Sequence, residues 1–425
     1  MAVTACWAGA GEVPRSAAGS GTGDISVWAH QGTVPENEAL IGIVADFNRS
    51  QDKVRARLRL TPPADYTGTV LITEPADLPD VLEFDGPTMA SLVANGKLTA
   101  ITPYVSSGTV DNATDTIRAQ GMAGGELYGL GMYDSGLGVY GDKSQLDAAG
   151  VDYPRGLDDA WSAEEFTDAL GTLAARDDDG QVLDIRENDG LGTEWGTFGF
   201  SPVLWSAGGG LLAGDHAAGV LDTRETAAAF ERFQEWKRYV HPNPDGTALQ
   251  EREVALSWAG HWVYGDYAAS LGSDLVVMPL PDFGNGVKTG QGSWAWGIGA
   301  NTKNGTAAGA FLDYLLGDER VARMTEANTA PPGTRSALAA SPLYGDGGPL
   351  RLFAEQLDRP CGDRDITPSC VAVTRPVTPG YPVITSEFSQ ALTKIYGGDD
   401  PRDRLSGAAR AIDRSYADND GYELP

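Results

Sequence analysis

The first hundred residues alternate between strand-like and helix-like hydrophobic patterns. DISVWA (24–29) is typical of a strand, and RARLRL (55–60) alternates polar and apolar positions as a second strand does. PENEALIGIVADFNRS (35–50) lies between them with helical spacing. Its apolar residues share one helical face: Leu40, Ile43, Val44 and Phe47. Pro35 suits the first turn of this helix.

The same alternation continues along the chain. LPDVLEF (78–84) predicts a third strand, and DGPTMASLVANGKL after it predicts a turn and a helix. In WSAEEF (161–166), Ser162 and Glu165 form a capping-box pattern that predicts a helix start. Strands that alternate with helices in this way indicate an α/β fold.

Composition narrows the possible partners. The chain has 425 residues, which suggests two or three domains or one large two-lobed unit. Its 59 acidic and 31 basic residues give a net charge of −28. This charge argues against nucleic acid and against anionic lipid, and it fits a solvated acidic surface. No apolar run reaches the roughly 18–20 residues of a membrane span.

Two of the three cysteines lie close together in CGDRDITPSC. A local disulfide between Cys361 and Cys370 would stabilise the fold by about 2–3 kcal/mol, and it would indicate an oxidising compartment. Zinc is the alternative, but no second cysteine or histidine pair lies nearby to complete such a site.

The common catalytic motifs are absent from the sequence. There is no G-x-S-x-G, no P-loop, and no G-x-G-x-x-G after the first strand. The four histidines are scattered without an H-x-x-x-H pair, so we expect no metal and no cofactor. A pair of carboxylates for glycoside hydrolysis remains possible, because acidic residues are abundant.

Aromatic and polar residues gather where predicted strands end, which is where open α/β sheets bind ligands. These candidates are His30, Gln31, Asp85, Trp258, His261, Trp262, Gln291, Ser293 and Trp294. Sugars suit this mixture, because their C–H faces stack on indole rings and their hydroxyls need polar partners. Core packing is the alternative for each tryptophan.

Nine segments, in order from about residue 24 to 416, resemble the extracellular solute-binding proteins of carbohydrate ABC importers, the group that includes maltose-binding protein. Among them are DVLEFDGPTMASLVANGKLTAITPYV, LYGLGMYDSGLGVYGDKSQL, EVALSWAGHW and GSWAWGIGANTKN. The resemblance implies two α/β lobes with a hinge and a ligand cleft between them. It assigns residues 24–133 and 298–345 to the N-terminal lobe, and 134–297 and 346–425 to the C-terminal lobe.

The resemblance also implies site residues. It places a sugar-binding carboxylate at Asp85 in EFDGP, a polar ligand residue at Asp134 beside Tyr133, and a stacking indole at Trp262. The chain departs from the family's NGPW pattern, with Ala259, Gly260 and His261 before Trp262. Further candidates by position are Phe200, Trp205, Arg335 and Tyr381, and for Arg335 a structural ion pair is the alternative.

The function implied is binding without turnover: a monomer captures a neutral sugar and delivers it to the membrane permease of an ABC importer. Two alternatives stay open at this point. One is a secreted glycoside hydrolase, and the other is a binder of a non-sugar ligand such as a polyol phosphate or a peptide. Low lysine content around the predicted site disfavours phosphate.

The N-terminal VTAC (3–6) resembles a bacterial lipobox, in which Cys6 would carry lipid after cleavage. Residues 1–23 would then be a lipobox remnant and a flexible tether, and the protein would be an extracellular lipoprotein on a Gram-positive cell. A chance cysteine in a disordered leader is the alternative. No basic or apolar signal region precedes Cys6, so the chain as it stands is expected to be soluble with a free Cys6 thiol.

Overall fold

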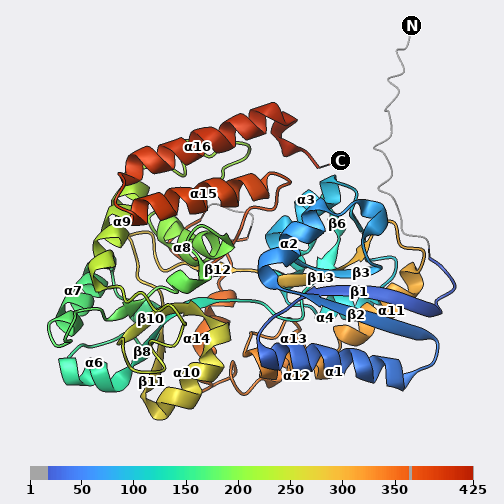
Figure 1. Ribbon diagram of the computed structural model, residues 1–425, viewed down its shortest axis with the longest axis horizontal. Helices are drawn as coiled ribbons and strands as arrows, with labels where there is room; N and C mark the ends of the chain where they lie inside the picture. Colours follow the sequence, from blue (N-terminus) through green and yellow to red (C-terminus); the bar gives the residue numbers. More distant parts are fainter. Residues whose placement is uncertain (1–17, 363–365, 425) are drawn as a thin grey trace, which may run out of the picture.

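The computed structural model describes residues 18–362 and 366–424, arranged as two α/β lobes side by side (Figure 1). The sheet of the first lobe has the order β2-β1-β3-β13-β4, and β7 also pairs with β13. Its strands are β1 (Gly23–His30), β2 (Val54–Thr61), β3 (Val81–Asp85), β4 (Leu98–Thr99), β7 (Gly129–Leu130) and β13 (Trp294–Gly299). The three strands predicted near the N-terminus are thereby confirmed. A small hairpin of β5 (Met122–Ala123) and β6 (Glu126–Leu127) lies beside this sheet.

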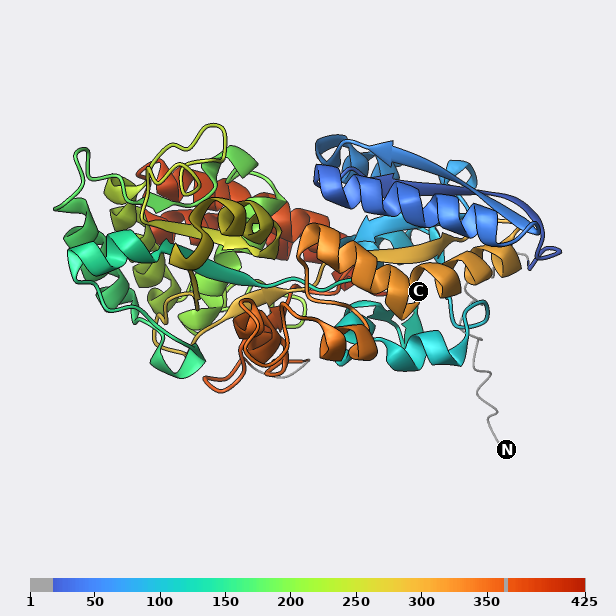
Figure 2. The same cartoon turned by 90° about the horizontal axis from the view of Figure 1, so that it is seen from below.

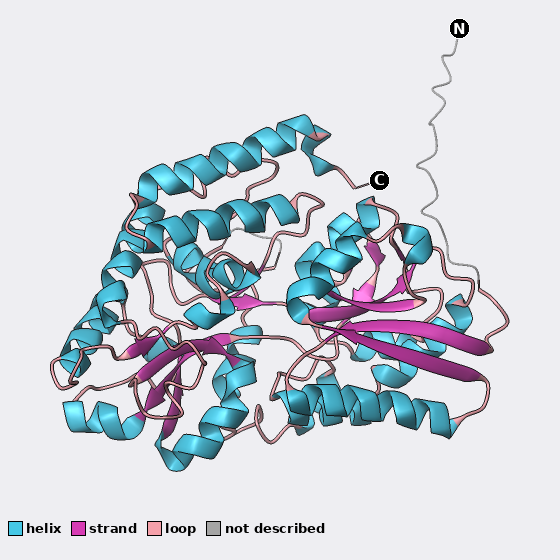
Figure 3. Cartoon of the chain, in the orientation of Figure 1, coloured by secondary structure: helices cyan, strands magenta, loops and turns pink. Residues whose placement is uncertain are grey.

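Helices pack around the first sheet, as Figure 3 shows in cyan around magenta strands. They are α1 (Val34–Ser50), α2 (Pro63–Ile72), α3 (Met89–Ala94), α4 (Ser107–Asn112), α5 (Asp115–Gln120), α11 (Gly305–Leu315), α12 (Asp318–Asn328) and α13 (Arg335–Ala340). The side chain of Thr33 caps the start of α1, and the predicted apolar face of α1 is buried. That face joins a core shared with the strands and with α11 and α12.

The second lobe has a four-stranded sheet in the order β11-β8-β10-β9. Its strands are β8 (Leu137–Asp142), β9 (Leu183–Asp184), β10 (Leu256–Gly260) and β11 (Leu275–Met278). Its helices are α6 (Lys143–Ala149), α7 (Ala163–Ala174), α8 (Glu194–Ser206), α9 (Arg224–Trp236), α10 (Tyr264–Leu271), α14 (Arg351–Leu357), α15 (Tyr381–Tyr396) and α16 (Pro401–Asp418). The capping box of Ser162 and Glu165 at α7 is confirmed.

Extended segments join the lobes, and Figure 2 shows the lobes side by side with these connections between them. One segment contains Tyr133 and Asp134, whose backbones pair with Pro332 and Pro331. Another follows β12 (Thr289–Gln291), which pairs in parallel with β14 (Ala372–Thr374).

One predicted lobe boundary needs correction. The resemblance places residues up to 297 in the C-terminal lobe, but β13 pairs with β3 from Trp294 onward. The chain therefore returns to the first sheet at Trp294, because the antiparallel ladder with β3 begins there.

The disulfide between Cys361 and Cys370 is present, with an S–S distance of 2.10 Å. It closes the loop that leads into β14. Cys6 and most of the predicted tether lie outside the described residues. Within the described part of the chain, no helix combines the length and apolar character that crossing a bilayer requires.

Candidate functional site

The first lobe presents His30 and Trp294 at the boundary between the lobes. His30 ends β1 and Trp294 begins β13, and their rings stack with centroids 3.8 Å apart and planes 9° apart. Nδ1 of His30 lies 2.7 Å from a carboxylate oxygen of Glu83. The hydrogen bond and the stacking together fix the orientation of both rings.

His30 and Glu83 form a buried pair whose pKa values shift for opposing reasons. Burial lowers the pKa of the His30 imidazole, whereas the charge and the hydrogen bond of Glu83 raise it. The upward effects together exceed the effect of burial, so the net shift is upward. Burial likewise raises the pKa of the Glu83 carboxyl, against the effect of His30. Sequence reasoning missed Glu83, although a charged residue between Leu82 and Phe84 in a buried strand is a usable signal.

An ion-pair network centred on Arg375 joins the two lobes. Arg375 follows β14, and its Nη1 lies 2.5 Å from Oε1 of Glu194 at the start of α8. Its Nη2 lies 3.4 Å from Oδ1 of Asp85, at the end of β3 in the first lobe, and 3.3 Å from the carbonyl oxygen of Gly292. The guanidinium carbon also lies 4.8 Å from the centre of the Phe198 ring.

This network perturbs the ionisation of both ends. Burial raises the pKa of Asp85 to about 6, although Arg375 opposes the rise. Burial lowers the pKa of the Arg375 guanidinium. The nearby groups of Asp85, Tyr381 and Glu194 raise it by more, so the net shift of this pKa is upward. Arg375 therefore stays charged. Asp85, at the lobe boundary, is a carboxyl whose pKa of about 6 lies close to neutral pH.

Tyr381 supports this network from the core. Its side chain is 0% exposed, and its hydroxyl donates to Oε1 of Glu194. The Thr385 hydroxyl donates to the other oxygen of Glu194 at 2.6 Å. The direct ligand contact expected of Tyr381 is not available in this conformation, because the side chain is enclosed; its role here is to position Glu194.

Trp262 lies at the end of β10 and is only partly buried. Its ring meets the edge of Trp195 at 5.9 Å between centroids and lies 6.3 Å from Phe198. Phe198 is also the ring beneath Arg375, so Trp262 belongs to the same neighbourhood as the ion-pair network. The C-terminal lobe thus places an aromatic surface beside charged groups.

His261 precedes Trp262 and points into the protein instead. It is 4% exposed, and its Nδ1 lies 3.3 Å from the Ser135 hydroxyl. Burial lowers its pKa to about 3, so the ring is neutral at physiological pH. In this conformation the His261 ring meets the Trp262 ring edge-on, with centroids 5.3 Å apart, and offers a ligand almost no surface.

Asp134 and Tyr133 lie in the crossing between the lobes. Asp134 is 1% exposed, and its Oδ1 accepts the N–H groups of Ser135 at 2.8 Å and Gly292 at 2.9 Å. In this conformation the Asp134 carboxylate is enclosed and ties two crossing segments together, and its ligand role stays a prediction. Tyr133 is buried too, and its hydroxyl donates to Glu36 at 2.7 Å.

Gln291 and Ser293 belong to the second crossing segment. Gln291 is 1% exposed, and within the described chain its Nε2 has no hydrogen-bond partner. The side-chain amide of Gln120 bonds both backbone groups of Ser293: its Oε1 accepts the N–H at 2.8 Å, and its Nε2 donates to the carbonyl oxygen at 2.6 Å. Gly292 between them has φ +95°, which favours glycine, and a Cβ there would lie 2.5 Å from Oε1 of Gln120. This arrangement fixes the crossing.

Three predicted stacking residues lie in the core of the second lobe and are corrected accordingly. Phe200 is 0% exposed, Trp205 2% and Trp258 1%, and all three join the same apolar cluster. The indole N–H of Trp258 is satisfied internally by the carbonyl of Gly199 at 2.9 Å. These rings have no surface left for a ligand.

The remaining two candidates are on the surface. Gln31 is exposed just beyond β1. Arg335 lies 2.7 Å from Asp115 in an exposed ion pair, which is the arrangement that the structural alternative for Arg335 expects.

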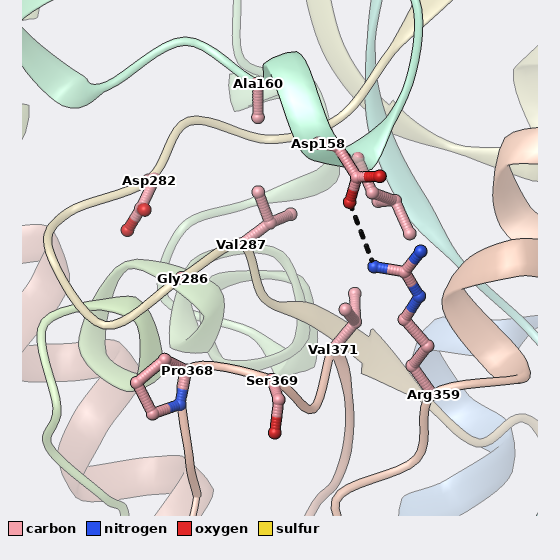
Figure 4. Close-up of a pocket in the computed structure, with 10 residues that line it drawn as sticks. Asp158, Ala160, Asp282, Gly286, Val287, Arg359, Pro368, Ser369 and Val371 are labelled. Carbon is pink, nitrogen blue, oxygen red and sulfur yellow. Dashed lines mark hydrogen bonds and ion pairs between the residues drawn. The ribbon is translucent and has the colours of Figure 1, made fainter.

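A separate cavity of about 480 Å³ opens in the second lobe beside the disulfide loop (Figure 4). Arg359 and Asp158 form an ion pair at 3.3 Å on its wall, and Val287 and Val371 contribute apolar lining. None of the predicted ligand residues lines this cavity. In residues 18–362 and 366–424, no group of three or more His, Cys, Asp or Glu side chains is arranged to hold a metal ion.

Residues 42–346 match the family of bacterial extracellular solute-binding proteins. The chain belongs to this family. The members of this family are solute-binding proteins. No curated protein matches the chain.

Solved structures support the same fold for this solute-binding protein. The cyclic α-maltosyl-1,6-maltose binding protein of Arthrobacter globiformis is 21% identical over 92% of this chain and 98% of its own, with a TM-score of 0.72. The GacH receptor of Streptomyces glaucescens is 20% identical over 93% and 98%, with a TM-score of 0.76. An ABC transporter solute-binding protein of Thermotoga lettingae bound with α-D-tagatose is 19% identical over 92% and 99%, with a TM-score of 0.76.

Proposed function

We propose that this solute-binding protein captures a neutral mono- or oligosaccharide between its lobes and delivers it to the permease of an ABC importer. The observation that carries the proposal is the set of groups at the lobe boundary. Trp262 supplies an aromatic surface from the second lobe. Asp85 from the first lobe, with Arg375 and Glu194 from the second, supplies charged hydrogen-bonding groups.

This combination matches the chemistry of a sugar. An indole ring covers the C–H face of a pyranose, and carboxylates and a guanidinium form charge-assisted hydrogen bonds with its hydroxyls. Hydroxyls buried without partners would each cost about 1–3 kcal/mol, so groups from both lobes are needed to close around a polyol. The relatives named above, which bind cyclic maltosyl-maltose, acarbose and tagatose, support a carbohydrate ligand.

The interlobe network also suggests how binding is coupled to closure. Arg375 belongs to the second lobe, and its long contact to Asp85 at 3.4 Å reaches the first. A ligand hydroxyl between these two groups would bond to both and would favour the state in which the lobes lie close together. The permease would then recognise this closed state.

A phosphorylated ligand fits less well. Arg375 is the buried guanidinium at this boundary, and two carboxylates already oppose its charge. A phosphate that paired with Arg375 would lie next to these two carboxylates. Repulsion between its negative charge and theirs disfavours such binding. Glycoside hydrolysis would need two of the same carboxylates to act on a bond, and the experiment below detects that outcome.

The extracellular family supports a location outside the cell membrane. We propose that the native protein is a lipoprotein anchored through Cys6 on a Gram-positive cell and acts as a monomer. The disulfide between Cys361 and Cys370 supports an oxidising compartment. Mass spectrometry of native membranes tests the anchor, and an unmodified Cys6 there would contradict it.

A thermal-shift screen tests the ligand class. Neutral mono- and oligosaccharides are compared with their phosphate esters, and the products are examined by chromatography after incubation. We expect the largest increase in Tm from a neutral sugar, with the sugar recovered intact. A larger shift from a phosphate ester would favour the polyol-phosphate reading, and sugar cleavage abolished by Asp85→Asn would favour the hydrolase.

A further inference from the structure

The outer edge of β2 is an open edge of the first sheet in the described part of the chain. β2 lies at the end of the strand order, and among the described strands it pairs only with β1 (Figure 1). The N–H of Gly23 donates to the carbonyl of Lys53, and the N–H of Gln31 donates to the carbonyl of Thr61. Odd-numbered residues of β2 therefore point their backbone groups at β1, and even-numbered residues point theirs outward.

The first half of this open edge is already covered by two side-chain amides. The amide of Gln51 bonds both backbone groups of Val54, at 2.8 Å and 2.6 Å. The amide of Asn48 does the same for Ala56, at 2.7 Å and 2.9 Å. Each amide imitates one residue of a neighbouring strand, which is one way in which proteins protect a sheet edge.

The second half of the edge has no such cover. In the described chain, no residue bonds the outward N–H or C=O of Leu58 or Leu60. Their side chains line a groove of about 310 Å³ together with Ile41, Val44, Ala45 and Asn48. Ile41 is 52% exposed at the rim of this groove. Open backbone groups therefore lie directly beside an apolar slot.

The opposite face of β2 is basic. Arg55, Arg57 and Arg59 are exposed and alternate with the apolar residues that face α1. Arg57 pairs with Asp24, and Arg59 lies 4.8 Å from the Trp28 ring. This row is notable in a chain of net charge −28.

We propose that the Leu58–Leu60 edge binds an extended segment of a partner polypeptide, in which apolar and acidic residues alternate. The segment would add a strand to the first sheet by pairing with Leu58 and Leu60. Residues opposite the leucines would fill the groove under Ile41, and the alternate residues would lie on the arginine face. This surface is separate from the interlobe site and goes beyond sugar capture.

A second copy of the chain is a poor occupant of this edge. Pairing β2 with β2 would set the row Arg55, Arg57 and Arg59 against the same row, and like charges directly opposite destabilise a ladder. An anionic membrane would be attracted by the arginines but would leave the outward backbone groups of Leu58 and Leu60 without partners.

The test uses the full chain and a capped eight-residue peptide of alternating Glu and Val, with affinity measured by calorimetry. Two further peptides carry N-methyl groups on all Val nitrogens or on all Glu nitrogens. Since only one of these sets faces β2, we expect one methylated peptide to bind like the parent and the other to bind about tenfold or more weakly. Equal behaviour of the two methylated peptides, or no parent binding at about 1 mM, would overturn the proposal.

Matched variants and hydrogen exchange locate the binding. Ile41→Asp should weaken peptide binding at least about tenfold, whereas Val34→Asp, at a 70% exposed position of the same helix outside the groove, should leave it unchanged. Exchange of the Leu58 and Leu60 amides should slow in the complex, while the Arg57 and Arg59 amides, already bonded to β1, stay as they were. Loss of binding in both variants, or protection elsewhere, would contradict the proposal, as would arginine-dependent binding to anionic vesicles without peptide binding.

Discussion

Asp85 is predicted to destabilise the folded protein at neutral pH, and replacing it tests this directly. Burial raises the pKa of its carboxyl from 3.8 to about 6, so the cost of burying the charge exceeds the attraction of Arg375. The folded state therefore holds the Asp85 proton more tightly than the unfolded state does. Stability attributable to Asp85 is highest below about pH 4, falls as the pH rises to about 6, and is constant above that.

The shift in pKa sets the magnitude. A rise from 3.8 to about 6 corresponds to at most about 3 kcal/mol of lost stability at pH 7. The Asp85 side chain retains 15% exposure, so solvent screening reduces the effect, and we expect about 1–3 kcal/mol. Asp85→Asn cannot ionise and leaves Glu194 to pair with Arg375. The variant should therefore be more stable than the parent at pH 7.

Urea unfolding followed by tryptophan fluorescence measures this difference at pH 7 and at about pH 3.5. The advantage of Asp85→Asn should shrink toward zero at the lower pH, where both proteins are neutral at this position. Asp158→Asn is the matched control, because its side chain is 91% exposed in an ion pair with Arg359, and it should change little at either pH. A parent as stable as Asp85→Asn at pH 7, or an advantage that grows as the pH falls, would refute the reasoning.

Three further predictions concern the core, the disulfide and the histidines. Trp258→Ala should cost about 3–5 kcal/mol in urea unfolding, because the ring is fully enclosed; a cost below about 1 kcal/mol would mean that it is not core. Cys361→Ser should cost about 2–3 kcal/mol by loss of the link to Cys370, and no loss would show that the loop is held by other contacts. In an NMR pH titration, His30 should titrate above 6.5 and His261 should stay neutral down to about pH 3; the reverse order would contradict the packing of both rings.

The sequence predicted regular structure well, because local periodicity decides it. The apolar face of α1 and the capping box of Ser162 and Glu165 both appear as predicted. The start of α9 is a position that local sequence leaves open: the Thr223 hydroxyl caps the helix, and the neighbouring Asp222 accepts the N–H of Gly219. Asp and Thr both suit this position, so only the fold separates them.

The candidate site was predicted less completely. Trp258 and Trp262 are four residues apart beside the same strand, yet one is enclosed and the other only partly buried. The difference arises from α8, whose Gly199 carbonyl accepts the Trp258 indole N–H, a contact between distant segments. Glu194 and Arg375 were missed for the same reason, since each is an isolated charge that becomes notable only when the lobes meet.

Binding of a neutral sugar against Trp262 at the lobe boundary is the property on which the proposed function depends. Titration calorimetry with the best sugar from the thermal-shift screen measures this, using the parent, Trp262→Ala and the surface control Arg335→Ala. We expect a Kd near 1 μM, about −8 kcal/mol, for the parent and the control, and binding at least about tenfold weaker for Trp262→Ala. Equal affinity of all three proteins would contradict the claim.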